Sequence, residues 1–166
     1  MTDSYYCNWT TSNIDIDQST SLLITPLKNK CCNDSRFVKK VKVAIYEALM
    51  NAIDHGNLEI SYKSMNINCD EAMYELIKKE RLTNPEYGNR KVTARYQVSD
   101  DRITYHIKDE GSGFNIRNIE DPTSPHNLEK CSGRGLALIK MYMDEVSFND
   151  KGNEIIMTIN LPADIT

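Results

Sequence analysis

The sequence predicts an α+β domain, a two-layer sandwich in which helices cover one face of a mixed, mostly antiparallel sheet. Apolar residues recur with a helical period over residues 36–52, and they alternate with polar residues over 92–107 and again over 155–161. Helices grouped against consecutive antiparallel strands make two layers. A chain of 166 residues can bury one sizeable core, so we expect a single domain over residues 1–166.

The N-terminal third is expected to contain an edge strand, a weak helix and one long helix. Residues 4–11 are rich in aromatic side chains, which indicates a strand, and a weak helical pattern over 18–30 is limited by Pro26. Asn33, Asp34 and Ser35 are candidate N-caps of the long helix, and Gly56 is its expected C-terminal stop. The apolar face of that helix consists of Phe37, Val38, Val41, Ala44, Ile45, Ala48, Leu49 and Ala52.

The remaining elements follow from the same two periods. A second helix is expected over residues 70–82, because Asn84 and Pro85 end the pattern. Alternation on both sides of a turn at 99–101 predicts a hairpin, and a helix after Gly135 leads into a last hairpin with its turn at 149–152. Residues 114–132 have no periodicity and are expected to form a loop.

Composition excludes several functional classes. A net charge of −4 and a pI near 5.4 argue against nucleic acid or an anionic membrane as the main partner. The basic run at residues 36–42 is interpreted as the solvated flank of an amphipathic helix. No apolar run is long enough to span a bilayer and no signal peptide is present, so a cytoplasmic protein is expected. Five scattered cysteines predict reduced thiols without a metal cage.

The long helix carries the first motif, which contains Glu47, Asn51, Asp54 and His55 before Gly56. Glu47 and Asn51 are four residues apart and therefore point in similar directions, beside the apolar stripe. An Asn carbonyl is a suitable Mg²⁺ ligand, and a neighbouring carboxylate can accept a proton from an attacking hydroxyl. The simpler interpretation is an exposed helix flank with a hydrogen bond between the two side chains.

A glycine turn at the end of a predicted strand is the second motif, with Asp109, Gly111, Gly113 and Phe114. Glycines there let the backbone approach a ligand closely, and the Asp carboxylate can accept a hydrogen bond from an exocyclic amine. An ordinary glycine turn leaving a hairpin is the structural alternative.

The third motif, formed by Ser132, Gly133, Arg134, Gly135 and Leu136, opens a predicted helix. Free N–H groups at a helix start form an anion site, and glycines permit close contact. Alone it is also compatible with a plain loop-to-helix junction, because short glycine patterns are frequent.

In this order and spacing, the three motifs closely resemble the ATPase domain of the gyrase, histidine-kinase and MutL superfamily (the Bergerat fold). The resemblance is best to the anti-sigma-factor serine kinases of bacterial partner switching. Three stretches carry it: EALMNAIDHGN at 47–57, KDEGSGF at 108–114 and SGRGLALIKMYMDEVSFNDKGNEI at 132–155. It covers nearly the whole chain, although residues 58–89 are longer than the smallest members need and have no assigned role.

The resemblance implies ATP and Mg²⁺ as cofactors and a role for each motif. Glu47 would be the general base, Asn51 the Mg²⁺ ligand, and Asp109 the partner of the adenine amino group above Gly113. Residues 114–132 would form a lid over ATP. The nucleotide-binding residues implied are Asn51, Asp54, His55, Asp109, Gly111, Gly113, Phe114, Ser132, Gly133, Arg134, Gly135 and Leu136, with His55 expected to cap or pack rather than catalyse.

The function implied is a serine/threonine protein kinase that phosphorylates a small antagonist protein and sequesters a sigma factor or another regulatory partner. The resemblance also allows a partner phosphatase and a homodimer. Two positions differ from the family pattern: Cys131 stands where these kinases often have Arg, and Asn153 follows Gly152 where Thr is common. Because Cys131 removes a cation from the phosphate end, the alternative is an ATP-dependent interaction switch without turnover.

Overall fold

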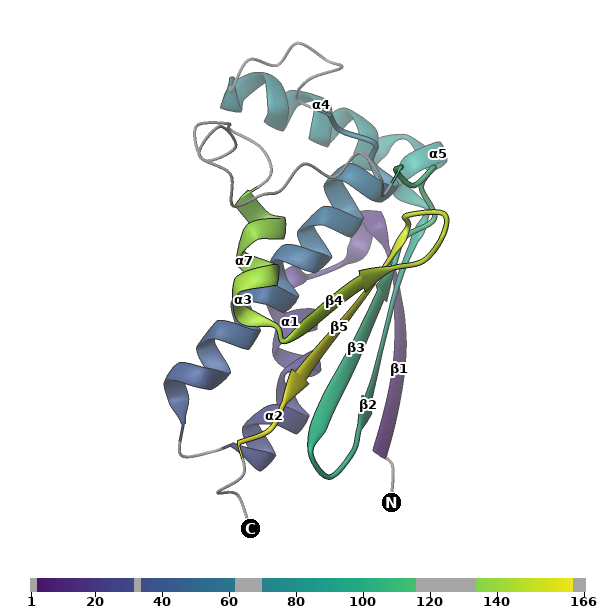
Figure 1. The fold of residues 1–166 in the computed structure, drawn as a ribbon. Coiled ribbons are helices and arrows are strands. Elements are labelled where there is room, and N and C mark those ends of the chain that lie inside the picture. The colour runs from purple at the N-terminus through teal and green to yellow at the C-terminus, as the bar shows by residue number, and fades with distance from the viewer. Residues whose placement is uncertain (1–2, 32–33, 62–69, 116–133, 163–166) are drawn as a thin grey trace.

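The computed structural model describes residues 3–31, 34–61, 70–115 and 134–162 of the 166-residue chain. Its sheet has five strands in the order β1-β2-β3-β5-β4 (Figure 1). Their bounds are β1 Asp3–Thr10, β2 Lys91–Val98, β3 Arg102–Lys108, β4 Glu145–Phe148 and β5 Glu154–Asn160. The predicted α+β class and the edge position of β1 are confirmed. All four pairings among the described strands are antiparallel, so the parallel pair of a mixed sheet is not found there.

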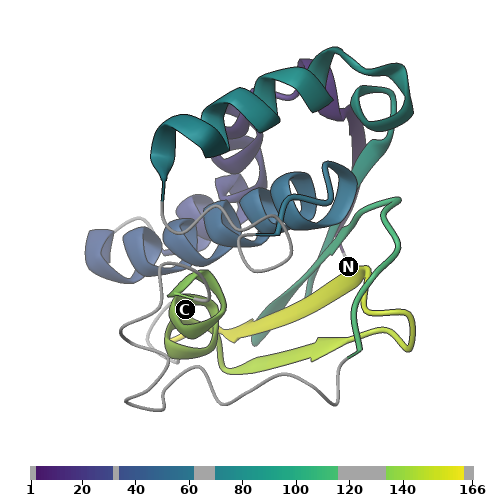
Figure 2. The ribbon, with the colours of Figure 1, turned by 90° about the horizontal axis from the view of Figure 1, so that it is seen from above.

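Helices cover one face of this sheet, which makes the two predicted layers (Figure 2). The helical segments are η1 Thr11–Asn13, α1 Ile16–Leu23, α2 Thr25–Lys30, α3 Ser35–Asn51, η2 Ala52–Asn57, α4 Glu71–Thr83, α5 Pro85–Gly88 and α7 Arg134–Tyr142. The weak helical pattern over 18–30 corresponds to two helices. Pro26 lies in the first turn of α2 and begins that helix rather than limiting one, since a first-turn proline lacks only an N–H that is unpaired anyway.

The long helix α3 begins as predicted but ends differently. Asp34 is its N-cap, and its carboxylate accepts the N–H of Phe37 at 2.9 Å. Gly56 does not stop the helix, because the chain continues as the π-helical turn η2, which closes with Leu58 N–H donating to Ile53 C=O at 2.8 Å. A π turn widens the helix and changes which residues face the sheet, and such turns occur frequently at functional sites.

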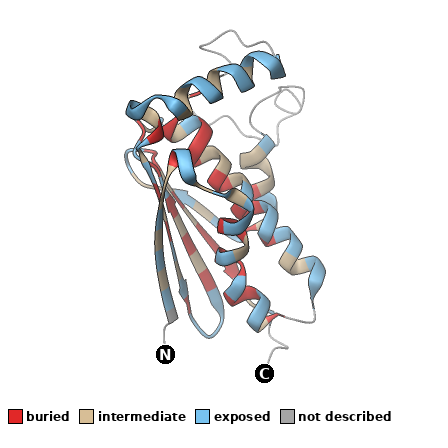
Figure 3. Cartoon of the chain, turned by 180° about the vertical axis from the view of Figure 1, so that it is seen from behind, coloured by how far each residue is buried: buried red, intermediate tan, exposed pale blue. Residues whose placement is uncertain are grey.

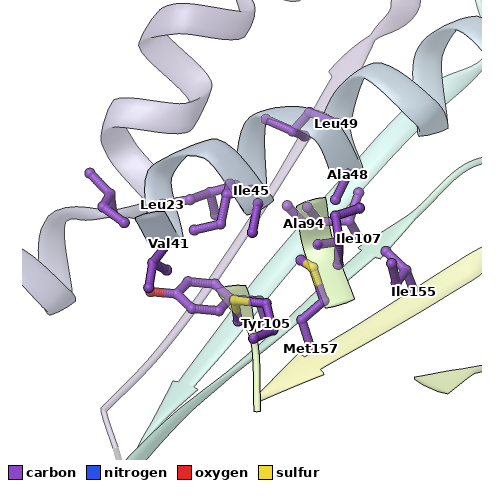
Figure 4. Close-up of a cluster of buried hydrophobic side chains, with 14 of the residues drawn as sticks. Leu23, Val41, Ile45, Ala48, Leu49, Ala94, Tyr105, Ile107, Ile155 and Met157 are labelled. Atoms are coloured by element: carbon purple, nitrogen blue, oxygen red, sulfur yellow. The ribbon is translucent and has the colours of Figure 1, made fainter. Parts of the chain in front are cut away.

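The hydrophobic core lies between the helices and the sheet, where the buried residues gather (Figure 3). Side chains of α3 such as Val41 and Ala48 lie against strand residues such as Tyr105 and Ile107 (Figure 4). The helical and strand periods seen in the sequence therefore identify the two faces of one core. Among the helices that the structure describes, none combines the length and apolar character that crossing a bilayer requires.

One core group breaks the rule that buried polar atoms are paired. Tyr105 is 0% exposed, and its hydroxyl has no hydrogen-bond partner among the described residues. Burial raises the pKa of this phenol well above its ordinary value. We therefore expect Tyr105→Phe, which keeps the ring, to raise the free energy of unfolding by about 1 kcal/mol in urea denaturation. Tyr6→Phe, at a side chain that is 63% exposed, is the matched control. A less stable Tyr105→Phe protein contradicts this prediction.

Candidate active site

A cavity of about 320 Å³ lies between α3, α7 and the strands β3 and β5. Its walls are mostly apolar, with a small number of polar groups, as is typical of small-molecule sites. The lining residues are Ala48, Asn51, Ala52, His55, Gly56, Ile107, Asp109, Gly113, Phe114, Leu136, Phe148, Gly152, Asn153, Glu154 and Ile155. Residues from all three sequence motifs therefore meet in one cavity.

Asp109 is the buried carboxylate of this cavity, directly after β3. It is 8% exposed, and its Oδ1 accepts the N–H of Gly111 at 2.8 Å. Burial raises the pKa of Asp109 to about 6, although the Gly111 N–H and the cations Lys151 and Arg90 oppose the shift. A Cβ at Gly56 would lie 2.4 Å from Asp109 Cγ. Only glycine in η2 therefore leaves room for this carboxylate.

Two asparagines outside the predicted site residues hold this turn in place. The Nδ2 of Asn153 donates to the backbone C=O of Asp109 at 2.8 Å, and Asn153 C=O accepts the N–H of Asp109 at 3.0 Å. Asn57 is fully buried, and its Oδ1 accepts the N–H of Glu110 at 2.7 Å. Asn153 thus supports the Asp109 backbone. Its signal in the sequence is its place after Gly152, where the family resemblance implies Thr.

Asn153→Ala is expected to weaken ATP binding because it removes a buried donor that fixes the Asp109 backbone. We expect Kd for ATP to rise about tenfold, equivalent to about 1.4 kcal/mol, and the protein to melt at a lower temperature. Calorimetric titration and thermal denaturation measure the two effects. Asn160→Ala, at an exposed side chain at the far end of β5, is expected to change neither. Equal Kd values for wild type and Asn153→Ala contradict the positioning role.

At the phosphate end predicted from the sequence, α7 approaches Glu47 and Asn51 on α3. A Cβ on Gly135 would lie 2.6 Å from Glu47 Oε2 and 3.5 Å from Asn51 Oδ1. The glycine therefore lets the first turn of α7 lie directly against both side chains. Glu47 is half-buried, and burial raises its pKa. This arrangement places a carboxylate of increased basicity beside a carboxamide and the N-terminus of a helix.

Aromatic and aliphatic side chains line the apolar end of the cavity. Phe114 and Phe148 make an edge-to-face contact with ring centroids 5.2 Å apart, and both line the cavity with Leu136 and Gly113. His55 also lines it, and its Nδ1 lies 2.7 Å from Ile60 O, consistent with a packing or capping role.

Asp54 requires a correction, because its carboxylate does not line the cavity. It lies against α4 instead, where Lys78 Nζ is 2.9 Å from Oδ1 and the Tyr74 hydroxyl donates to Oδ2. A buried carboxylate needs such a cation and donor, and α4 supplies both. Residues 71–83 of the long insertion thus fix the η2 turn of the site.

Two glycine-motif residues also lie outside the cavity walls. Gly111 lies behind Asp109, where a Cβ would meet Gly56 O at 2.2 Å, and the Arg134 side chain is exposed at the first position of α7. Ser132, Gly133 and Cys131 lie outside the described residues, as does the predicted lid from residue 116 onward.

Because the pKa of Asp109 is raised, we expect the affinity for ATP to depend on pH. A protonated carboxyl is a poorer acceptor for an amine, so ATP is expected to bind the ionised form. With a pKa of about 6, Kd is expected to be about tenfold higher at pH 5 than at pH 7, and constant above pH 7. Calorimetric titration across this range measures it. A change of the same size with adenosine, which has no phosphate, would assign the effect to the base-binding end, and a flat profile contradicts the assignment.

The chain is similar to known ATPase-domain and kinase sequences. The sequence profile of the histidine kinase-like ATPase domain matches residues 29–159. The serine-protein kinase RsbW of Oceanobacillus iheyensis is 23% identical over 142 residues, covering 82% of this chain and 73% of the relative. The anti-sigma F factor of Clostridium perfringens is 29% identical over 123 residues (70% and 68%), and RsbW of Bacillus licheniformis is 30% identical over 128 residues (73% and 63%).

The matched residues include β2, β3, α3, α7 and nearly all of β5, together with every described residue of the cavity. The fold, the placement of the three motifs and the profile all lead to the same result. The chain belongs to the histidine kinase-like ATPase domain family.

Proposed function

We propose that this protein is an ATP-dependent serine/threonine kinase that phosphorylates a small antagonist protein. One observation carries the proposal. Glu47 and Asn51 of α3 lie against the start of α7, beside a cavity that the Asp109 carboxylate also lines. A carboxylate for the base, a carboxamide for a cation and a helix N-terminus for phosphates are the groups that phosphoryl transfer requires.

We expect a purine nucleotide to bind in this cavity together with Mg²⁺. Apolar walls such as Ile107 and Ile155 suit the faces of the adenine ring, and Asp109 can accept a hydrogen bond from its amino group. The described residues contain no cluster of three or more His, Cys, Asp or Glu side chains that could hold a metal alone. A cation would therefore bind the Asn51 Oδ1 together with phosphate oxygens, as Mg²⁺ commonly does in nucleotide sites.

Glu47 would act as the general base. It accepts the proton of a serine hydroxyl while that oxygen attacks the γ-phosphorus, and the bond to the β–γ bridging oxygen breaks to release ADP. The raised pKa of Glu47 makes it a better proton acceptor than an exposed carboxylate. Bound Mg²⁺ supplies charge neutralisation at the phosphates, and Asn51 and the α7 N–H groups orient them.

The names of the relatives support this assignment, since they include serine-protein kinases and anti-sigma F factors. We therefore infer that the protein substrate is an anti-sigma-factor antagonist and that the chain also sequesters a sigma factor or another regulatory partner. A partner phosphatase, a homodimer and a cytoplasmic location belong to the same proposal.

A second candidate function is an ATP-dependent interaction switch without phosphotransfer. The observation that favours it is Cys131, which replaces the cation that related kinases often carry just before the Ser-Gly pair. In this case ATP would order the protein for partner binding and would remain intact.

Incubation with γ-labelled ATP, Mg²⁺ and purified candidate antagonists from the same genome separates the two functions. The kinase proposal expects label on a serine of one antagonist. Nucleotide-dependent binding without label contradicts the kinase proposal and supports the switch. An absence of both label and nucleotide-dependent binding contradicts both.

A further inference from the structure

The outward side of α3 carries a group of basic side chains. The helix contains Arg36, Lys39, Lys40 and Lys42 against one acidic residue, Glu47, so it has a formal charge of +3 in a chain of −4. All four cations are exposed. None of the four forms an ion pair with any residue that the structure describes. A strong positive patch therefore stands out on an acidic protein.

The position of these cations is unfavourable for the helix itself. Arg36 lies in the first turn, where the helix dipole disfavours positive charge, and that turn contains no acidic residue. Arg36 is also three and four residues from like charges, which is destabilising on a helix surface. The N-cap Asp34 supplies one carboxylate at this end of the helix, whereas Arg36, Lys39 and Lys40 supply three positive charges. Local stability does not account for the pattern, so an external acidic partner is the better explanation.

Apolar side chains continue this surface toward the active site. Val43 is 38% exposed and Tyr46 is 37% exposed. At about 100° per residue, the basic stripe formed by Arg36, Lys39, Lys40, Val43 and Tyr46 spans about 120°, opposite the buried Ile45. Glu47 lies within the same sector, one turn after Val43.

The neighbouring helix α7 packs beside α3, and its Met141 is 69% exposed. The first turns of α3 extend past α7 (Figure 2). Neither Val43, Tyr46 nor Met141 belongs to the hydrophobic core cluster. Exposed apolar side chains next to cations form a surface with the chemistry of a protein interface, in which apolar contacts lie inside a charged rim.

We propose that the basic stripe of α3 docks the protein that receives the phosphate, through an acidic surface on that protein that flanks its serine. This inference rests on the proposed kinase function. A substrate held on Val43 and Tyr46 reaches Glu47 directly, since the three residues share one side of α3. Opposite charge steers the encounter and sets specificity. A nucleic acid or an anionic membrane would also meet the stripe, but both are repelled by the net charge of −4.

The test is a double charge reversal, Lys39→Glu with Lys40→Glu, measured with each purified candidate antagonist as the probe. We expect KM for the phosphorylated antagonist, and Kd for its binding, to rise about tenfold or more. The saturating rate and Kd for ATP are expected to stay at wild-type values. In wild type, KM should rise between 50 and 300 mM NaCl, and the variant should lose this dependence. Lys79→Glu with Lys91→Glu, at two exposed lysines on α4 and β2, is the matched control.

The possible outcomes separate a failure of the docking surface from a failure of the kinase function. Unchanged KM and Kd in the double variant overturn the docking surface while leaving the kinase intact. Charge-sensitive binding without any label overturns the kinase and the assignment of the bound protein as phosphate acceptor, and leaves the stripe only as a binding surface for an acidic protein. If wild type binds no candidate, or if only cosedimentation with phosphatidylserine-containing vesicles depends on Lys39 and Lys40, the proposal of a protein partner is overturned.

Discussion

Asp109→Asn is expected to abolish measurable ATP binding and, at the same time, to stabilise the folded protein at pH 7.5. Asn is nearly the same shape and can still accept the Gly111 N–H, so the turn should persist. Its carboxamide has no negative charge and presents N–H groups of its own toward an amine, so the acceptor for adenine is lost. Calorimetric titration with ATP and Mg²⁺ measures the loss.

The stability effect follows from the sign of the pKa shift. Because burial raises the pKa of Asp109 from 3.8 to about 6, the carboxyl favours folding below pH 4, and this contribution is lost as pH rises through 6. The neutral Asn escapes that loss. Asp109→Asn should therefore melt at a higher temperature than wild type at pH 7.5, with the difference vanishing near pH 4. Asp100→Asn, in the exposed hairpin turn, is the control. Undiminished ATP binding by Asp109→Asn contradicts the site.

Glu47→Gln is expected to remove phosphotransfer and to leave ATP bound. Gln has the same length but cannot accept the serine proton, and a general base typically contributes about 10²–10⁴ to the rate. We therefore expect the transfer rate at saturating ATP to fall at least about 100-fold, with Kd for ATP within about threefold of wild type because Glu47 does not line the base-binding cavity. Single-turnover transfer of labelled phosphate measures the rate.

Glu75→Gln, an exposed carboxylate on α4, is the matched control and should transfer phosphate at the wild-type rate. If Glu47→Gln also transfers phosphate at the wild-type rate, Glu47 is not the base. If Glu47→Gln loses ATP binding together with transfer, Glu47 holds the nucleotide or its cation instead.

Much of the fold could be predicted because it depends on local signals. The alternation at Ile103, Tyr105 and Ile107 identified β3, and the helical spacing before Asn51 identified α3. The end of α3 was predicted incorrectly because glycine commonly ends a helix, and Gly56 was therefore expected to do so. In this protein it is needed for a different reason: Asp109 packs against it from 53 residues away. Contacts of that range leave no periodic signal in the sequence.

In the site, too, the residues with local sequence signals could be predicted, and those that depend on long-range contacts could not. Asn51, Asp109 and Gly135 come together as the motif order predicted, since each sits at an element end that the fold brings to one place. Asp54 was assigned to the nucleotide only because it falls inside the first motif. Its true partner, Lys78, belongs to an insertion whose packing depends on tertiary contacts. Asn153 differs from the Thr that the family resemblance implies, and its pairing with the Asp109 backbone depends on a tertiary contact that the sequence pattern does not indicate.

A crystal structure of the complex with ATP and Mg²⁺ would show where each part of the nucleotide binds. We expect the adenine amino nitrogen at about 3 Å from an Asp109 carboxylate oxygen, with the cation on Asn51 Oδ1 and the phosphates at the start of α7. A nucleotide bound elsewhere, or a purine in this cavity with its amino group turned away from Asp109, would contradict this expectation.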